Sequence, residues 1–356
     1  MSKTIKYAKN GALIGGMAFL VANLIKQLIR IDEDPNLKFD WEDFLLSGGK
    51  GALIGGGAGV IAGSIKDYNN SLEKPLNTSF ILNDFIGEMT LDTRDIHYRL
   101  LENKAVKITS IINTNYADVI DGSIIRYGST EENTALKDDF DIDISVPFAP
   151  KSFSSTKLMF DELYDFLEDN YEDKDLITIR PQKTSIGLLF NIKGKEFKVD
   201  IVPLKRTRNK KESSSGYLIV NKKSLFQEDS YTKTDISTLR SIKLSPVQQK
   251  VLVAIKGWKK NYDVPISSHL VKLFILDAYK ANQGAIPRDL TKKLLMVLYH
   301  IRNEINFKRI VSIENTNNVL TDMKESKKEK IRIACDEVIE EYNYQPNSIL
   351  HYFTNN

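Results

Sequence analysis

Three aspartates in two apolar segments of this chain could bind divalent metal ions. Asp141 and Asp143 lie in residues 140–146, which read FDIDISV, and Asp200 lies in a second apolar run that ends at Pro203. Residues two apart in a strand point to the same face, so Asp141 and Asp143 would share one face. Because Mg²⁺ prefers carboxylate oxygens, and a neighbouring strand can add Asp200, the pattern predicts a site for two Mg²⁺ or Mn²⁺ ions.

Such a site would suit transfer of a nucleoside monophosphate from a triphosphate to a hydroxyl group. Two ions about 3.5 to 4 Å apart can hold the attacking and leaving oxygens of an in-line displacement. Asp200 would bind the ion that carries the nucleophile and could accept its proton. A turn at Gly128 and Ser129 precedes the first two aspartates. It offers a close-approach backbone and a hydroxyl, which together can grip a triphosphate.

Each of these motifs is common by itself. A Gly-Ser pair is usually an ordinary turn, and Asp-x-Asp in a strand is more often a solvated face than a pair of metal ligands. The combination is informative because ionised carboxylates are seldom placed among apolar residues without a compensating ion. The three motifs together therefore predict an enzyme.

The order Gly128-Ser129, Asp141/Asp143 and residues 200–203 (DIVP) resembles the polymerase-β-type nucleotidyltransferase superfamily. Within it, the chain is similar to the cGAS/DncV-like (CD-NTase) family. The resemblance implies an α+β fold, with a polymerase-β-like sheet lobe and a helical lobe. It also implies nucleoside triphosphate substrates such as ATP, and synthesis of a signalling nucleotide, cyclic or oligomeric, in bacterial antiphage defence.

The same resemblance implies further contacts to the nucleotide. Lys256 and Ser268 match the family's triphosphate contacts, and His269 takes the place of the aromatic residue that stacks on the base. On residue type alone, His269 is equally a histidine at a helix N-terminus. Arg180 and Lys183 lead into the central sheet and could face either substrate or water.

The chain departs from the family in two places. Bacterial members carry Arg-Gly-Thr after the Gly-Ser turn, whereas residues 132–134 here are Glu-Asn-Thr, so only Thr134 is kept as a nucleotide contact. The single cysteine, Cys335, cannot build the Cys/His zinc thumb by which the animal enzyme grips DNA. DNA sensing of that type is not expected.

The composition suits a cytoplasmic enzyme. The chain has 356 residues, 42% hydrophobic and 27% charged, which is enough for two lobes around a core. Its formal net charge of +3 is too small for general coating of nucleic acid. A basic run at residues 205–211 follows the Asp200 segment and could contact a phosphate-bearing molecule or form a solvated loop.

The N-terminal part contains an internal repeat. GALIGG occurs at residues 11–16 and again at 51–56, and each copy opens an apolar run of about fifteen residues. Glycines four apart give a bare helix face that can pack closely. The runs are shorter than the roughly twenty residues that span a bilayer. We expect a glycine-zipper helical hairpin for self-assembly or for docking to a membrane effector partner; association with the membrane itself is the alternative.

These patterns divide the chain into four parts. Residues 1–78 form the hairpin and a linker, residues 79–240 the catalytic lobe, residues 241–342 the helical lobe, and residues 343–356 a flexible aromatic tail. A tail tyrosine such as Tyr352 could serve as an acceptor hydroxyl, because a phenol is chemically competent and a tail could reach a cleft.

Apolar periodicity predicts the elements of the two lobes. Strands are expected at residues 120–127, 140–146, 177–180, 185–192 and 198–202. Helices are expected mainly at residues 80–116, 153–170, 245–261, 267–282, 288–305 and 321–342.

Two other functions fit the same residues. The enzyme could make linear RNA or DNA oligomers, start them on a protein tyrosine, or add a nucleotide to a tRNA or protein. Alternatively, the acidic site could be a non-catalytic nucleotide sensor joined to a membrane or assembly module.

Overall fold

The computed structural model describes residues 76–208, 215–220, 230–315 and 317–354. The predicted hairpin, with both copies of the repeat, lies outside these residues, and so does the end of the basic run. The described residues from Asn77 onward form part of one compact unit. Among them, no helix combines the length and the apolar character needed to cross a membrane.

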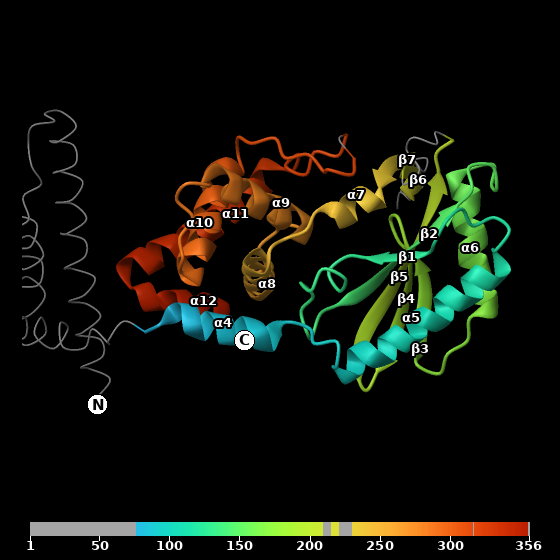
Figure 1. Cartoon of the computed structure of the whole chain (residues 1–356), viewed down its shortest axis with the longest axis horizontal. Coiled ribbons are helices and arrows are strands. Elements are labelled where there is room, and N and C mark those ends of the chain that lie inside the picture. Colours follow the sequence, from blue (N-terminus) through green and yellow to red (C-terminus); the bar gives the residue numbers. More distant parts are fainter. Residues whose placement is uncertain (1–75, 209–214, 221–229, 316, 355–356) are drawn as a thin grey trace, which may run out of the picture. The chain divides into compact units, whose positions relative to one another are not determined.

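A mixed sheet forms the catalytic lobe (Figure 1). Its order is β1-β2-β5-β4-β3, with β6 paired to β5 and β7 paired to β6. Strands β2 and β5 are parallel, and the other pairs are antiparallel. The strands are β1 Ile125–Tyr127, β2 Asp141–Phe148, β3 Leu176–Pro181, β4 Ile186–Ile192, β5 Lys195–Arg206, β6 Ser215–Val220 and β7 Ser230–Asp235.

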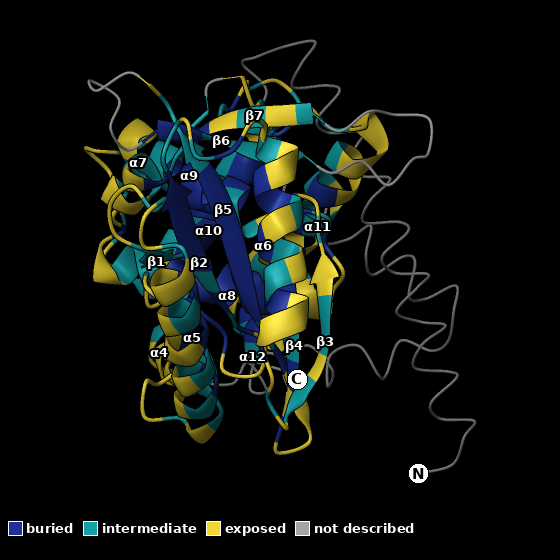
Figure 2. Cartoon of the chain, turned by 90° about the vertical axis from the view of Figure 1, so that its right-hand side faces the viewer, coloured by how far each residue is buried: buried dark blue, intermediate teal, exposed yellow. Residues whose placement is uncertain are grey.

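Two helices cover one face of this sheet. Helices α5 (Ile96–Asn115) and α6 (Thr156–Asn170) share a core with the apolar residues of β2 and β5. Ile142 and Val199, which alternate with the aspartates, are almost fully buried in that core. Strand β5 is buried along most of its length (Figure 2). Because side chains alternate along a strand, the aspartates point to the opposite face.

The predicted helix over residues 80–116 is in fact two helices, α4 (Thr78–Met89) and α5. Thr90 has extended backbone and forms an isolated bridge with Leu136, which ends α4. Asp95 then accepts hydrogen bonds from two backbone N–H groups at the start of α5. An N-cap of this kind begins a new helix, so the chain changes direction between the two.

The helical lobe has its own apolar core, to which α4 contributes Leu82 and Ile86. Figure 1 shows α4 among these helices, away from the sheet that follows it in the sequence. A short helix, α7 (Ile236–Ser241), links the two lobes. The others are α8 Pro246–Asn261, α9 Ser268–Ala281, α10 Leu290–Glu304, α11 Glu325–Tyr344 and α12 Ile349–Thr354, with a 3₁₀ turn at Pro346–Ser348.

The C-terminal segment differs from the predicted flexible tail. Helix α12 packs on α8. The ring of Phe353 stacks on that of Trp258, with 6.2 Å between the ring centroids, and the ring centroids of Tyr352 and Tyr262 lie 5.4 Å apart. Tyr352 is only 7% exposed. Burial of these aromatic side chains stabilises the segment although it lacks a clear helical pattern. The Tyr352 hydroxyl could therefore act as an acceptor only if α12 left the core.

Candidate active site

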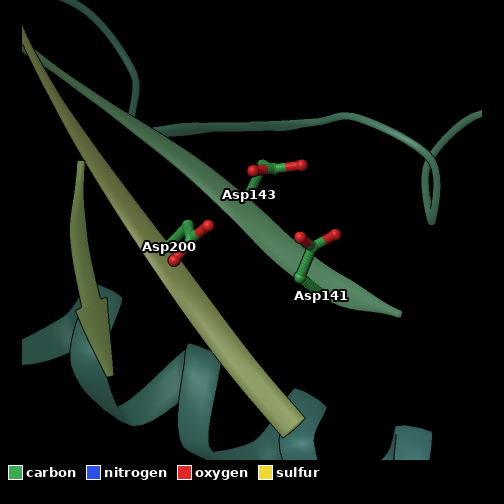
Figure 3. A group of neighbouring side chains, drawn as sticks. All are labelled: Asp141, Asp143 and Asp200. Carbon is green, nitrogen blue, oxygen red and sulfur yellow. The ribbon is translucent and has the colours of Figure 1, made fainter. Parts of the chain in front are cut away.

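The three aspartates meet on two adjacent parallel strands (Figure 3). Asp143 of β2 is the direct Cα partner of Asp200 of β5, and Asp141 lies two residues earlier on β2. One carboxylate oxygen from each residue lies within 4.8 Å of the others. The spacing in the sequence thus brings together three hard oxygen ligands at one place on the sheet.

The electrostatics of the group fit a divalent cation. Burial and, to a smaller extent, the nearby charges of Asp141 and Asp200 together raise the pKa of Asp143 to about 8. Burial also raises the pKa of Asp200. Within the described part of the chain, none of the three carboxylates forms an ion pair with a lysine or arginine. A divalent ion would supply the missing positive charge, because hard cations bind clustered carboxylates.

We expect the affinity of this site for Mn²⁺ to rise with pH. Asp143, with a pKa of about 8, holds a proton at neutral pH, and a metal ion must displace that proton to bind. Below pH 8 the dissociation constant should therefore fall by up to about tenfold for each unit of pH, and it should level off above that value. Titration with Mn²⁺ between pH 6 and pH 9 measures this, and an affinity independent of pH would contradict it.

Gly128 brings the Gly-Ser turn directly against Asp143. Its φ is +84°, and an ideal Cβ built there would lie 2.1 Å from Oδ2 of Asp143. The preceding residue, Tyr127, is the Cα partner of Asp143 in β1. Glycine adopts this backbone without strain and leaves room for the carboxylate.

The third aspartate is held by the hairpin between β3 and β4. Nε2 of Gln182 donates a hydrogen bond of 3.0 Å to Oδ1 of Asp200. The Ser185 hydroxyl donates to Oε1 of Gln182 at 3.1 Å, which fixes the amide orientation. Gly187 leaves room for this amide, because a Cβ at position 187 would lie 2.1 Å from Nε2 of Gln182 and the side chain would have to move. Gln182 is therefore a positioning residue for Asp200.

Replacing Gln182 by methionine should lower turnover by about 10-fold to 100-fold, the usual cost of removing a partner of a metal ligand. Methionine keeps the length of the side chain but cannot donate to Asp200. Steady-state kinetics at several Mn²⁺ concentrations should show a higher metal requirement. Lys174→Met, at an exposed site outside the hairpin, is the control; equal metal requirements in the two variants would show that Gln182 does not position Asp200.

A cavity of about 230 Å³ adjoins the Gly-Ser turn, and we call it the nucleotide cavity after the nucleotide contacts predicted among its lining residues. Of the predicted nucleotide contacts, six line it: Gly128, Ser129, Thr134, Lys256, Ser268 and His269. Arg180 and Lys183 do not line the cavity, and both are exposed. Arg180 lies on β3, and its positive charge lowers the pKa of Asp200. The opposite effect of burial on that pKa is larger.

Residues 132–134 are tied to the helical lobe by three polar contacts. Nζ of Lys256 donates to the Thr134 carbonyl at 2.8 Å, and Nε2 of Gln249 donates to the Glu132 carbonyl at 3.0 Å. Nζ of Lys272 forms an ion pair of 2.8 Å with the Glu132 carboxylate. Glu132 thus has a defined role where the family resemblance leads one to expect arginine.

His269 is the second residue of α9, and polar groups hold its ring. Nε2 lies 3.0 Å from Oγ of Ser312 and 3.6 Å from Oε2 of Glu314. Ser312 in turn donates to the other carboxylate oxygen of Glu314. These contacts fix one edge of the imidazole in the wall of the nucleotide cavity.

Sequence reasoning missed three charged residues of this cavity: Arg240, Lys272 and Glu314. Lys272 follows Ser268 by four residues, so the helical period could have placed it on the same face. Arg240 belongs to α7, a helix with no clear apolar pattern that the sequence analysis did not predict.

No family model matches this sequence, and no curated protein matches it. Solved structures do. The Escherichia coli MS115-1 CdnC structure with ATP is 18% identical, with a TM-score of 0.58 over 77% of this chain and 95% of that chain. The Bradyrhizobium diazoefficiens CD-NTase CdnG in complex with GTP is 14% identical, with a TM-score of 0.59 over 79% and 96%. The chain therefore has a cGAS/DncV-like nucleotidyltransferase fold, as the motifs led us to expect.

A complex of the same CdnC with HORMA-deltaN is also similar. That match is 16% identical, with a TM-score of 0.56 over 78% of this chain and 95% of that chain.

Proposed function

We propose that this chain is a divalent-metal-dependent nucleotidyltransferase that joins units from nucleoside triphosphates into a signalling nucleotide. The observation that carries the proposal is the meeting of Asp141, Asp143 and Asp200 beside the nucleotide cavity. The fold supports it, because structures with this fold were solved with ATP and with GTP. A role in antiphage defence is part of the proposal and rests on the family resemblance.

The proposed roles follow from position. Asp141 and Asp143 would hold both metal ions, and Asp200 would bind the ion on the side of the attacking hydroxyl. When bound, the ions supply charge stabilisation to the attacking and leaving oxygens. Asp200 is suited to accept the hydroxyl proton, because burial raises its pKa and Gln182 keeps its carboxylate oriented.

The cavity residues would bind the triphosphate and the base. Ser129 and Ser268 offer hydroxyls, and the ammonium of Lys256 offers a positive charge. Burial lowers the pKa of Lys256, so an anionic phosphate would favour its charged form. His269, held at one edge by Ser312, would present its ring to the base.

The defining experiment incubates the purified protein with each labelled ribo- and deoxyribonucleoside triphosphate and Mg²⁺ or Mn²⁺. Asp141→Ala/Asp143→Ala protein is the control. A small product that resists phosphatase would identify a cyclic messenger, and a nuclease-sensitive ladder would identify linear oligomers. Label that shifts with protease would identify protein priming. Nucleotide binding without any product would instead favour the sensor function.

A further inference from the structure

A second cavity, of about 330 Å³, lies beside the nucleotide cavity, and we call it the lysine cavity. Three lysines of α8 line it: Lys256, Lys259 and Lys260. Lys256 and Ser268 line both cavities. They therefore form a wall that the two spaces share.

Two of these lysines lack a carboxylate partner in the described structure. Nζ of Lys256 donates to the carbonyl of Thr134 at 2.8 Å, and Nζ of Lys259 donates to the carbonyl of Ile266 at 3.0 Å. A carbonyl satisfies a hydrogen bond but does not neutralise a charge. Burial lowers the pKa of both lysines, and the charge of Asp139, which lines the same cavity, opposes this only in part. An anion in the lysine cavity would compensate both.

The remaining charges lie at more exposed positions. Lys260 forms an ion pair with Asp139 at 3.1 Å, and each side chain is at least half exposed. Asp263, also exposed, has no partner among the described residues. The lysine cavity therefore has one buried lysine, Lys256, one half-buried lysine, Lys259, an exposed ion pair and one exposed carboxylate. The N-terminus of α9, at Ser268, adds the positive end of a 14-residue helix.

We propose that the lysine cavity binds the pyrophosphate released in each catalytic cycle. This proposal rests on the proposed function. In nucleotidyl transfer, the hydroxyl oxygen attacks the α-phosphorus while the bond to the α–β bridging oxygen breaks. The bonding electrons leave with pyrophosphate, and the hydroxyl proton passes to the carboxylate of Asp200. The released anion starts at the wall of Lys256 and Ser268, and Lys259, which has no carboxylate ion pair in the described structure, lines the cavity on the other side of that wall.

The test is calorimetric titration of inorganic pyrophosphate into full-length protein. Asp141→Asn/Asp143→Asn serves as the parent, without metal or nucleotide, so that turnover plays no part. Lys259→Met in this background should weaken binding by about tenfold, because a charge-assisted contact is lost. Lys250→Met, on the same helix, should not change it, because Lys250 contacts Asn83 and lines neither cavity.

Asp263→Asn tests the same cavity by charge alone. Its φ is +49°, a conformation that asparagine also tolerates, so the fold should be kept. Removing the negative charge should tighten pyrophosphate binding by about threefold. If Lys259→Met fails to fold, Asp263→Asn and Lys260→Met decide, with Lys260→Met expected to weaken binding.

Unchanged pyrophosphate affinity in the folded variants overturns the proposal, even if the wild-type enzyme makes product. So does the absence of measurable binding to the parent. Failure of the proposed function is a separate result, because it appears as no turnover of any triphosphate by the wild type. In active enzyme, Lys259→Met should also raise the inhibition constant for pyrophosphate by about tenfold while changing the KM for triphosphate less.

Discussion

Asp143→Asn is expected to lower turnover by about 10³-fold or more and to leave the protein at least as stable as the wild type. The loss of activity follows because a metal ligand provides several kcal/mol of charge stabilisation in the transition state. The gain in stability follows because Asp143 is buried beside two like charges.

The sign of the stability effect depends on pH. Folding raises the pKa of Asp143 from 3.8 to about 8, so its contribution to stability is fully present below pH 3.8. This contribution is lost as the pH rises through 8. Asparagine cannot ionise and escapes the loss, so the Tm of the variant should exceed that of metal-free wild type increasingly between pH 5 and pH 8.

Initial rates and thermal unfolding without metal measure the two effects. Asp118→Asn is the matched control, because Asp118 is exposed and lies away from the acidic strands. Retained turnover in Asp143→Asn would refute the proposed chemistry. Loss of activity with a lower Tm would show that Asp143 supports the fold rather than a metal ion.

Gly128→Ala is expected to lower turnover by about 100-fold, the scale on which a displacement of about 1 Å affects a reaction. The new methyl group would meet Oδ2 of Asp143 at 2.1 Å, so the carboxylate or the turn must move. The positive φ should also cost about 1 to 2 kcal/mol of stability.

Gly194→Ala separates these two effects. Gly194 has nearly the same φ, +85°, but nothing lies within 4 Å of the position of its Cβ. It should lose a similar amount of stability for the backbone strain and keep full turnover. Comparable turnover in Gly128→Ala and Gly194→Ala would mean that the close approach to Asp143 has no part in catalysis.

The acidic site could be predicted because the pattern that places its residues lies within short segments of the sequence. The period of two along 140–146 places Asp141 and Asp143 on one face whatever the tertiary structure, and the third carboxylate needed only a neighbouring strand. The sequence could not show which residues would be opposite each other. That register, which pairs Asp143 with Asp200, depends on contacts between distant segments.

The parts that were missed lack a local signal or depend on long-range packing. The hairpin of β6 and β7 alternates weakly between apolar and polar residues, and it directly precedes α7, so no periodic pattern marks this region. Helix α12 has only six residues, too few to be stable alone. Its stability comes from burial against α8, and its own sequence does not indicate that contact. Glu132 was identified only as a departure from the family, because its partner, Lys272, lies on a different lobe.

The parallel pairing of β2 with β5 also constrains how the protein can fold. Strand β5 is made after β3 and β4, yet it lies between β2 and β4 in the sheet. Pairing distant strands requires closure of a long loop before the contacts form, which is intrinsically slow. A nascent chain therefore contains Asp141 and Asp143 well before it contains the strand that supplies Asp200. The acidic site is therefore incomplete in the nascent chain until this central strand has been made and inserted between its neighbours.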